Sequence, residues 1–193
     1  MVRFLQDHIN QICEKKTMRK IMLFLIIVFL LPGCKKEYNI SDSQTILFQF
    51  DYINHAWGYQ HYGFIIDNEG NILKYNSPEG WNFPDNDLMI NENKVYENLN
   101  KCLFADKNIS TDELQKYTNY IENISSSKIT ALKNVAADAG TAEFICYKYS
   151  ENSGTYKGYL IKMEGDFSCE NLNFYSKKVV VWMKDIGNNI AYN

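Results

Sequence analysis

The sequence predicts an α+β domain in which an antiparallel sheet of four to five strands carries helices packed on one face. Segments with the alternation of strands fall into two groups, near residues 45–75 and 141–163, whereas apolar residues at helical spacing lie between these groups and at the C-terminal end. Grouped strands with grouped helices favour an antiparallel sheet over a parallel one built from alternating units. A hydrophobic content of 46% and an aromatic content of 15% provide ample material for a packed core.

Residues 1–33 are excluded from this domain because they have the order of a secretory signal peptide. Arg19 and Lys20 precede an uninterrupted apolar run from Ile21 to Leu31, about half of the roughly 20 residues that a membrane-spanning helix needs. Leu31-Pro32-Gly33-Cys34 then resembles the lipobox of bacterial lipoprotein precursors. The resemblance implies cleavage after Gly33 and acyl chains such as palmitate on Cys34.

The sequence also bears on the residue at which translation starts and on the membrane in which the protein resides. Met18 stands directly before the basic pair, so residues 1–17 are either an extended n-region or the product of an upstream start at Met1. The polar residues 34–44 predict a lipidated cysteine followed by a tether. Lys35 and the residues after it resemble the surface-export signal of Bacteroidetes lipoproteins. We therefore expect a lipid-anchored envelope protein, placed at the outer membrane and either periplasmic or surface-exposed.

Removal of the signal leaves an acidic chain. Residues 1–33 hold five of the 20 lysines and arginines and two of the 23 aspartates and glutamates, so residues 34–193 carry 15 basic and 21 acidic groups, a net charge of −6. Nucleic-acid binding requires a basic face, so no nucleic-acid partner is expected. An acidic domain is also not attracted electrostatically to anionic lipid. Membrane attachment is therefore expected to depend on the acyl chains on Cys34.

A single globular domain is predicted over residues 45–193. Five of its segments have the composition and pattern of strands: Thr45–Ile53, Trp57–Asp67, Ile72–Tyr75, Thr141–Tyr149 and Tyr156–Met163. Gly70 can supply the positive φ of a short hairpin loop, and Asp67 and Asn68 suit its first positions. The last two segments flank a polar turn that contains glycine and predict a second hairpin.

The interval between the two groups of strands begins with an irregular loop of about 16 residues, Asn76–Asn91, and loops of this length are commonly functional or mobile. Apolar residues at helical spacing then predict helices over Val95–Leu103 and Leu114–Ile124, with a capping box from Ser110 to Glu113 before the second. The same spacing from Tyr175 to Ile190 predicts a C-terminal helix.

Three cysteines follow the lipidated one: Cys102, Cys146 and Cys169. They allow at most one internal disulfide, for which Cys146 and Cys169 are the preferred pair because they lie in neighbouring predicted elements. The alternative is that all three are buried as small apolar side chains.

Residues suited to catalysis or metal binding are few. His55 and His61 would form a metal site only if Asp51 or Asp67 joined them, and no tight ligand spacing is present, so neither a metal nor another cofactor is expected. A hydrolase could use His61 as base and Asp67 as the group that orients it. The chain contains no phosphate-binding glycine loop, dinucleotide fingerprint or Gly-x-Ser-x-Gly motif.

Aromatic side chains in segments that look exposed are the strongest functional feature. Tyrosine and tryptophan often anchor recognition surfaces, and the candidate binding surface consists of Trp57, Tyr59, His61, Trp81, Phe83, Asp85 and Asp87. Trp57-Gly58-Tyr59 followed by Gly63 and Ile72 also resembles secreted bacterial proteins to which no activity is assigned. The alternative is that these rings only cover the sheet beneath the long loop.

The sequence thus favours a lipid-anchored cell-envelope protein that is a non-enzymatic binding module, with another protein as its partner. One form of this hypothesis is an immunity lipoprotein that neutralises a toxin, since such inhibitors are often small, acidic and lipid-anchored. Two other hypotheses stay open: an envelope hydrolase that uses His61 and Asp67, and a structural subunit of a larger envelope complex.

Overall fold

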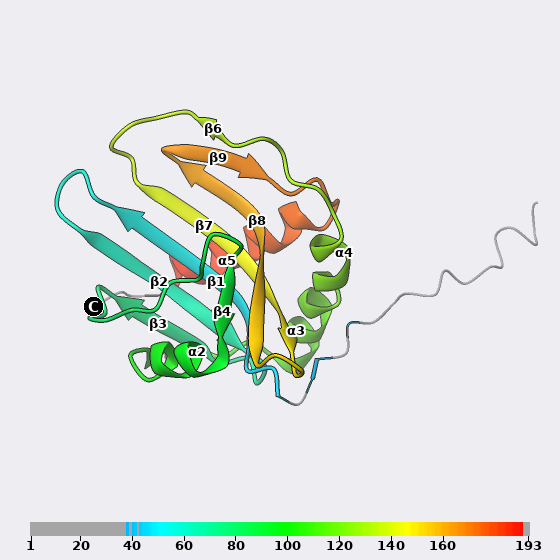
Figure 1. The fold of residues 1–193 in the computed structure, drawn as a ribbon. Helices are drawn as coiled ribbons and strands as arrows, with labels where there is room; N and C mark the ends of the chain where they lie inside the picture. The colour runs from blue at the N-terminus through cyan, green and yellow to red at the C-terminus, as the bar shows by residue number, and fades with distance from the viewer. Residues whose placement is uncertain (1–37, 39, 42, 191–193) are drawn as a thin grey trace, which may run out of the picture. The chain divides into compact units, whose positions relative to one another are not determined.

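The computed structural model describes residues 38, 40–41 and 43–190, and they form one antiparallel sheet with helices on both faces (Figure 1). The strands are β1 (Ile46–Asn54), β2 (Gln60–Asp67), β3 (Ile72–Asn76), β4 (Met89–Asn91), β5 (Leu103–Phe104), β6 (Lys133–Asn134), β7 (Thr141–Ser150), β8 (Thr155–Gly165) and β9 (Phe167–Glu170). The helices are α2 (Glu92–Leu99), α3 (Thr111–Thr118), α4 (Ile121–Ser125) and α5 (Ser176–Asn188). The predicted α+β class with an antiparallel sheet is confirmed.

The sheet has nine strands, in the order β5-β3-β2-β1-β7-β8-β9-β6 with β4 beside β8, and not the four to five expected. The five longest strands, β1, β2, β3, β7 and β8, match the five segments that the residue pattern predicts. The other four have only two to four residues each. Strands this short cannot display a period of two, so only their pairing with longer strands identifies them.

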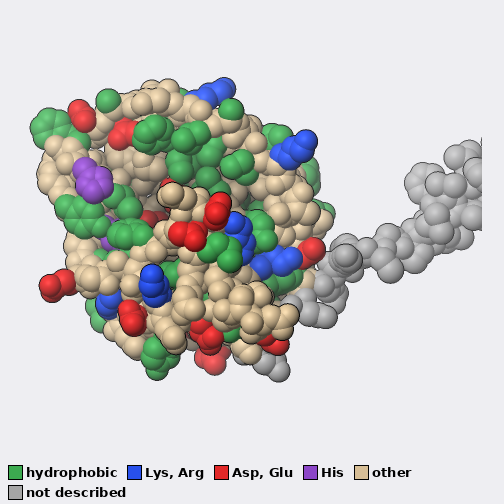
Figure 2. Space-filling view, in the orientation of Figure 1, with side chains coloured by type: hydrophobic (Ala, Val, Ile, Leu, Met, Phe, Trp, Pro, Cys, Tyr) green, Lys and Arg blue, Asp and Glu red, His purple; other side chains and the backbone are tan. Residues whose placement is uncertain are grey.

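One face of the sheet, called the front face here, is partly covered by β4, α2 and the loop of residues 77–88. Val95 of α2 packs with Ile65, Ile145 and Tyr147 of the sheet. Helices are therefore not confined to one face as expected, because β4 pairs with β8 and continues directly into α2. Figure 2 shows hydrophobic side chains gathered over the half of this face that α2 leaves uncovered.

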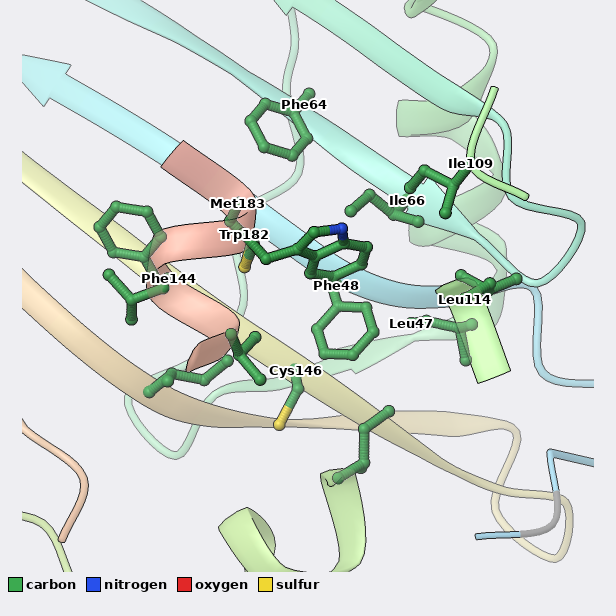
Figure 3. Packing of buried hydrophobic residues seen from close by; sticks show 14 of the residues in the cluster. Leu47, Phe48, Phe64, Ile66, Ile109, Leu114, Phe144, Cys146, Trp182 and Met183 are labelled. Carbon is green, nitrogen blue, oxygen red and sulfur yellow. The ribbon is translucent and has the colours of Figure 1, made fainter. Parts of the chain in front are cut away.

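The opposite face, called the rear face, packs against α3, α4 and α5 and forms the larger core (Figure 3). Trp182 of α5 lies at its centre: its ring meets Phe48 edge-on at 5.2 Å between centroids and stacks on Tyr117 at 4.0 Å. The indole Nε1 donates a hydrogen bond to Glu113 Oε1 at 2.9 Å. This one side chain therefore joins the sheet, α3 and α5.

Local sequence signals explain two features of the chain around this core. Ser110 caps α3 as predicted, since its hydroxyl accepts from Glu113 N at 3.3 Å, but the Glu113 carboxylate binds Trp182 instead of completing the capping box. The helix predicted over Leu114–Ile124 is broken into α3 and α4 near Asn119. In the β2–β3 hairpin, Gly70 has the positive φ expected of it, +84°.

The described part of the predicted tether is folded onto the domain. Gln44 is almost fully buried, and its side-chain amide donates to the carbonyl oxygens of Ile46 and Tyr147 at 3.0 and 2.9 Å. Tyr38 donates to the other end of Gln44 at 2.6 Å, so the domain begins at or before Tyr38 and not at Thr45. The predicted signal peptide and Cys34 lie outside the described residues. Within those residues, no helix combines the length and the apolarity needed to cross a membrane.

Candidate functional site

A row of paired residues crosses four strands on the front face. Glu143 of β7 lies opposite Asp51 of β1, Asp51 lies opposite Gly63 of β2, and Gly63 lies opposite Tyr75 of β3. Residues paired in this way point to the same face of a sheet. A Cβ atom on residue 63 would collide with the Tyr75 hydroxyl and the Phe50 carbonyl oxygen. The missing side chain of Gly63 therefore lets Tyr75 reach across β2 to Asp51.

The row belongs to a buried hydrogen-bond network. The Tyr75 hydroxyl donates to Asp51 Oδ1, and His61 Nε2 lies 2.8 Å from the same oxygen. Gln49 joins the network by donating to the Tyr75 hydroxyl oxygen at 3.0 Å and accepting from the Tyr147 hydroxyl at 2.7 Å. Burial, followed by the charge of Asp51, raises the pKa of Tyr75 well above its usual value, so this phenol remains a donor. The network ties β1, β2, β3 and β7 together.

His61 is the least satisfied member of this network. It is fully buried, and its Nδ1 is the one buried side-chain nitrogen or oxygen among the described residues that has no hydrogen-bond partner. Asp51 Oδ1 accepts from Tyr75, and a His61 tautomer with its proton on Nε2 would be a second donor to the same oxygen. The rings of Trp81 and Phe83 lie 5.5 and 5.1 Å from the imidazole centroid and enclose it. In this arrangement His61 supports Asp51 and does not present a base to solvent.

The predicted pairing of His61 with Asp67 is wrong. Asp67 lies in the β2–β3 hairpin, where Oδ1 accepts from the backbone nitrogens of Glu69 and Asn71 at 2.9 and 2.8 Å. Oδ2 accepts from the Asn71 side-chain amide at 2.8 Å. A short carboxylate followed by a glycine turn satisfies these nearby donors first, because they lie within four residues. The acidic partner of His61 is Asp51, whose strand lies beside β2.

Most of the residues predicted as a binding surface lie around His61. Tyr59, from the start of the β2 segment, has its ring 6.1 Å from the His61 ring, and Trp81 and Phe83 approach it from the 77–88 loop. Trp57, in the β1–β2 turn, is 79% exposed, Tyr59 is 53% exposed and Phe83 is 46% exposed. We refer to Trp57, Tyr59, Trp81 and Phe83 as the aromatic surface. It lies at the end of β1 that is farther from the point where the chain enters the domain (Figure 1).

The two aspartates of the predicted surface lie in the 77–88 loop, and Asp85 uses its carboxylate there. Asp85 Oδ1 accepts from the backbone nitrogens of Asp87 and Met89 at 2.9 and 2.8 Å, next to the start of β4. The backbone carbonyl oxygen of Asp87 accepts from Lys157 Nζ of β8. Between Trp81 and Phe83, the Asn82 backbone nitrogen donates to Asn98 Oδ1 of α2 at 2.8 Å, which ties this part of the loop to the helix.

A small pocket, called the front pocket here, lies beneath the loop of residues 77–88, between β1 and β7. It has a volume of about 230 Å³, and its walls include Asp51, Trp81, Phe83, Glu143 and Tyr147. Burial first, and then the charge of Asp51, raises the pKa of Glu143 from 4.5 to about 7. The pocket thus combines two carboxyl groups with aromatic walls.

A larger pocket of about 660 Å³ opens on the rear face near the end of α5. Its floor consists of the rings of Phe50, Phe64 and Phe144, which also belong to the rear core or pack against it. Its charged groups, Lys184 and Glu164, already form an ion pair with each other. It therefore offers apolar surface without a free charged group, in contrast to the front pocket.

The cysteines do not form the predicted disulfide. Cys102, Cys146 and Cys169 are all free thiols, so the preferred disulfide is not formed: β8 lies between β7, which carries Cys146, and β9, which carries Cys169. Burial raises the pKa of the Cys102 and Cys146 thiols to about 12, which makes them unreactive at neutral pH. Nowhere in the described ranges do three histidine, cysteine or acidic side chains gather as metal ligands.

The sequence pattern did not identify Gln49, Tyr147 or Glu143 as parts of the site. Their signal is the presence of polar groups at alternate strand positions, which is also the pattern of a solvent-facing strand. The coverage of the front face by β4, α2 and the loop buries Gln49, Tyr75 and Tyr147 and leaves Glu143 half-buried. No family model, curated protein or solved structure matches the chain, so the candidate site is defined by its own geometry.

Proposed function

We propose that this protein is a lipid-anchored component of the bacterial cell envelope that binds another protein through its aromatic surface. The observation that carries the proposal is the exposure of Trp57, Tyr59 and Phe83 around a rigid, buried polar network. Exposed tryptophan and tyrosine contribute large apolar contact areas at a small entropic cost, which makes them frequent anchors of protein interfaces.

The position of the aromatic surface suits a protein held by its N-terminus. Gln44 lies just before β1, and Trp57 follows the other end of this strand. Nine residues of strand span about 26 Å at roughly 3.3 Å per residue. The aromatic surface therefore lies at the end of β1 remote from Gln44, where its exposed rings are accessible to a partner.

Rigid support favours recognition over a role in which the rings only cover the sheet. Trp81 lies 4.2 Å from the Tyr75 ring, and Tyr75 is fixed by hydrogen bonds to Gln49 and Asp51. A side chain that is already ordered loses less conformational entropy when a partner binds. The aromatic surface therefore combines exposed rings with a preorganised base.

The membrane address is tested by intact mass and membrane fractionation of the full chain beside Cys34→Ala. We expect a diacylated or triacylated species that begins at Cys34 in the membrane fraction and loss of that fraction in the variant. A soluble, unlipidated wild-type protein would contradict the address.

Partner binding is tested by co-purification from crosslinked envelopes of the native bacterium. The variant Trp57→Ala/Tyr59→Ala/Phe83→Ala is compared with Tyr96→Ala, which removes another exposed ring, 67% accessible, from α2. We expect the triple variant to lose a partner that the wild type and Tyr96→Ala both retain. A partner retained by all three proteins would contradict the proposed surface. The identity of the partner would show whether it is a toxin or a resident envelope protein.

A further inference from the structure

The front pocket contains two carboxyl groups, and no lysine or arginine of the described residues forms an ion pair with either of them. Asp51 and Glu143 are paired across β1 and β7, and the Cβ atoms of such pairs lie about 4.5–5.5 Å apart. Asp51 is contacted by His61 and Tyr75, whereas Glu143 forms no hydrogen bond or ion pair with any described residue. Lys148, Lys162 and Lys184 form ion pairs with Glu122 or Glu164 and not with the two pocket carboxyl groups.

The walls of the pocket are suited to a cation that has an alkyl stem. Aromatic side chains, Trp81, Phe83 and Tyr147, stand beside the two carboxyl groups, and Ile145 and Leu88 supply apolar contacts. Ring faces attract ammonium and guanidinium groups, and carboxylates form charge-assisted hydrogen bonds with them. A volume of about 230 Å³ lies below the range of roughly 300–1,000 Å³ that is typical of sites for drug-sized ligands. It therefore suits one long side chain or a small amine.

Two further observations indicate that the pocket is electrostatically incomplete. Burial and the charge of Asp51 disfavour the ionised form of Glu143, as its raised pKa of about 7 shows. A cation between the two groups would offset both effects. His61, which contacts Asp51 but does not line the pocket, also leaves Nδ1 without a partner. No described lysine or arginine forms an ion pair with Asp51 or Glu143, so a bound ligand could supply the compensating cation.

We propose that this pocket binds the ammonium or guanidinium group of a lysine or arginine side chain of the partner protein. The claim that the cation belongs to a partner protein rests on the proposed function. The claim that the pocket binds a cation does not. The exposed rings of Trp57, Tyr59 and Phe83 then contact the partner around one inserted basic side chain, which acts as the central anchor of the interface.

Isothermal titration calorimetry on the full-length protein in a non-ionic detergent tests this proposal at pH 8 and low salt. The probes are Nα-acetyl-lysine N-methylamide, its arginine counterpart, the uncharged norleucine counterpart, and butylamine as a free amine. We expect the lysine or the arginine compound to bind with a dissociation constant of about 1 mM, which corresponds to about −4 kcal/mol, and norleucine to bind at least tenfold more weakly. Glu143→Gln should weaken binding about tenfold, whereas Glu79→Gln, which neutralises an exposed carboxylate of the 77–88 loop, should leave it unchanged.

Equal affinity for lysine and norleucine would overturn the proposal, and this comparison needs no variant to fold. Equal losses in Glu143→Gln and Glu79→Gln would overturn it as well, since they would indicate nonspecific attraction to an acidic domain. Tighter binding of butylamine than of either amino-acid compound would overturn the assignment to a partner side chain, because it would identify a free amine as the ligand. Trp57→Ala/Tyr59→Ala should still bind the lysine compound, so a failure of partner capture and a failure of the cation pocket are distinguishable.

Discussion

Replacing Glu143 by glutamine removes an ionisable group from the front pocket and keeps nearly the same shape. Burial and the neighbouring charge of Asp51 raise the pKa of Glu143 from 4.5 to about 7. Below pH 4.5 the carboxyl group is protonated in the folded and the unfolded chain alike. Between pH 4.5 and 7 the folded protein holds this proton more strongly, so the contribution of Glu143 to stability falls as the pH rises.

The size of this effect follows from the pKa values. At 1.36 kcal/mol for each pH unit, a change from 4.5 to about 7 corresponds to about 3 kcal/mol at pH 8. Glutamine has no charge to bury. We therefore expect Glu143→Gln to have a free energy of unfolding similar to that of the wild type at pH 4.5 and about 2–3 kcal/mol higher at pH 8.

Urea unfolding monitored by tryptophan fluorescence measures the free energy of unfolding at pH 4.5 and at pH 8. Glu79→Gln is the control for an exposed carboxylate. The control should follow the wild type at both pH values within about 0.5 kcal/mol. If the difference in the free energy of unfolding between Glu143→Gln and the wild type does not change with pH, the pKa of Glu143 is not raised in the folded protein. Lower stability of the variant at pH 8 would refute the raised pKa too, because it would mean that the ionised carboxylate is stabilised in the fold.

Three further predictions concern the network and the core. Tyr75→Phe removes the donor to Asp51 and the acceptor for Gln49, so we expect it to cost about 2–3 kcal/mol in urea unfolding, with Tyr96→Phe on the exposed face of α2 as a neutral control. Trp182→Ala empties the centre of the rear core and should lower the free energy of unfolding by about 3–5 kcal/mol; a loss below 1 kcal/mol would contradict the packing. Ser110→Ala removes the cap of α3 and should cost about 1 kcal/mol, which a shift of the urea midpoint would reveal.

The sequence predicted the elements whose signals are local and long. The five long strands carry enough residues to show their pattern, and Ser110 capped α3 as expected because a hydroxyl group acts on the backbone three residues away. The four short strands could not be predicted, since two to four residues do not define a period. The position of α2 on the front face also depended on a contact that no local signal records, the pairing of β4 with β8.

The candidate site was predicted only in part, for the same physical reason. The aromatic residues near His61 stood out by their chemical type, and the structure brings Tyr59, Trp81 and Phe83 to that side chain. The partner of His61 was assigned wrongly because Asp67 and Asp51 are both close to it in sequence, and only strand register separates them. Glu143 joins Asp51 across 92 positions of the chain, a distance over which neither composition nor spacing specifies a contact.

A photo-crosslinking amino acid placed at Tyr59 in the native bacterium tests the central claim most directly, because it reports what touches the aromatic surface in the intact envelope. The same probe at Tyr96 of α2 is the matched control, since both positions are exposed tyrosines. We expect one discrete protein adduct from position 59 that is absent from position 96 and is lost when Trp57 and Phe83 are both replaced by alanine. Identical adducts from the two positions, or an adduct from position 59 that survives those replacements, would contradict it.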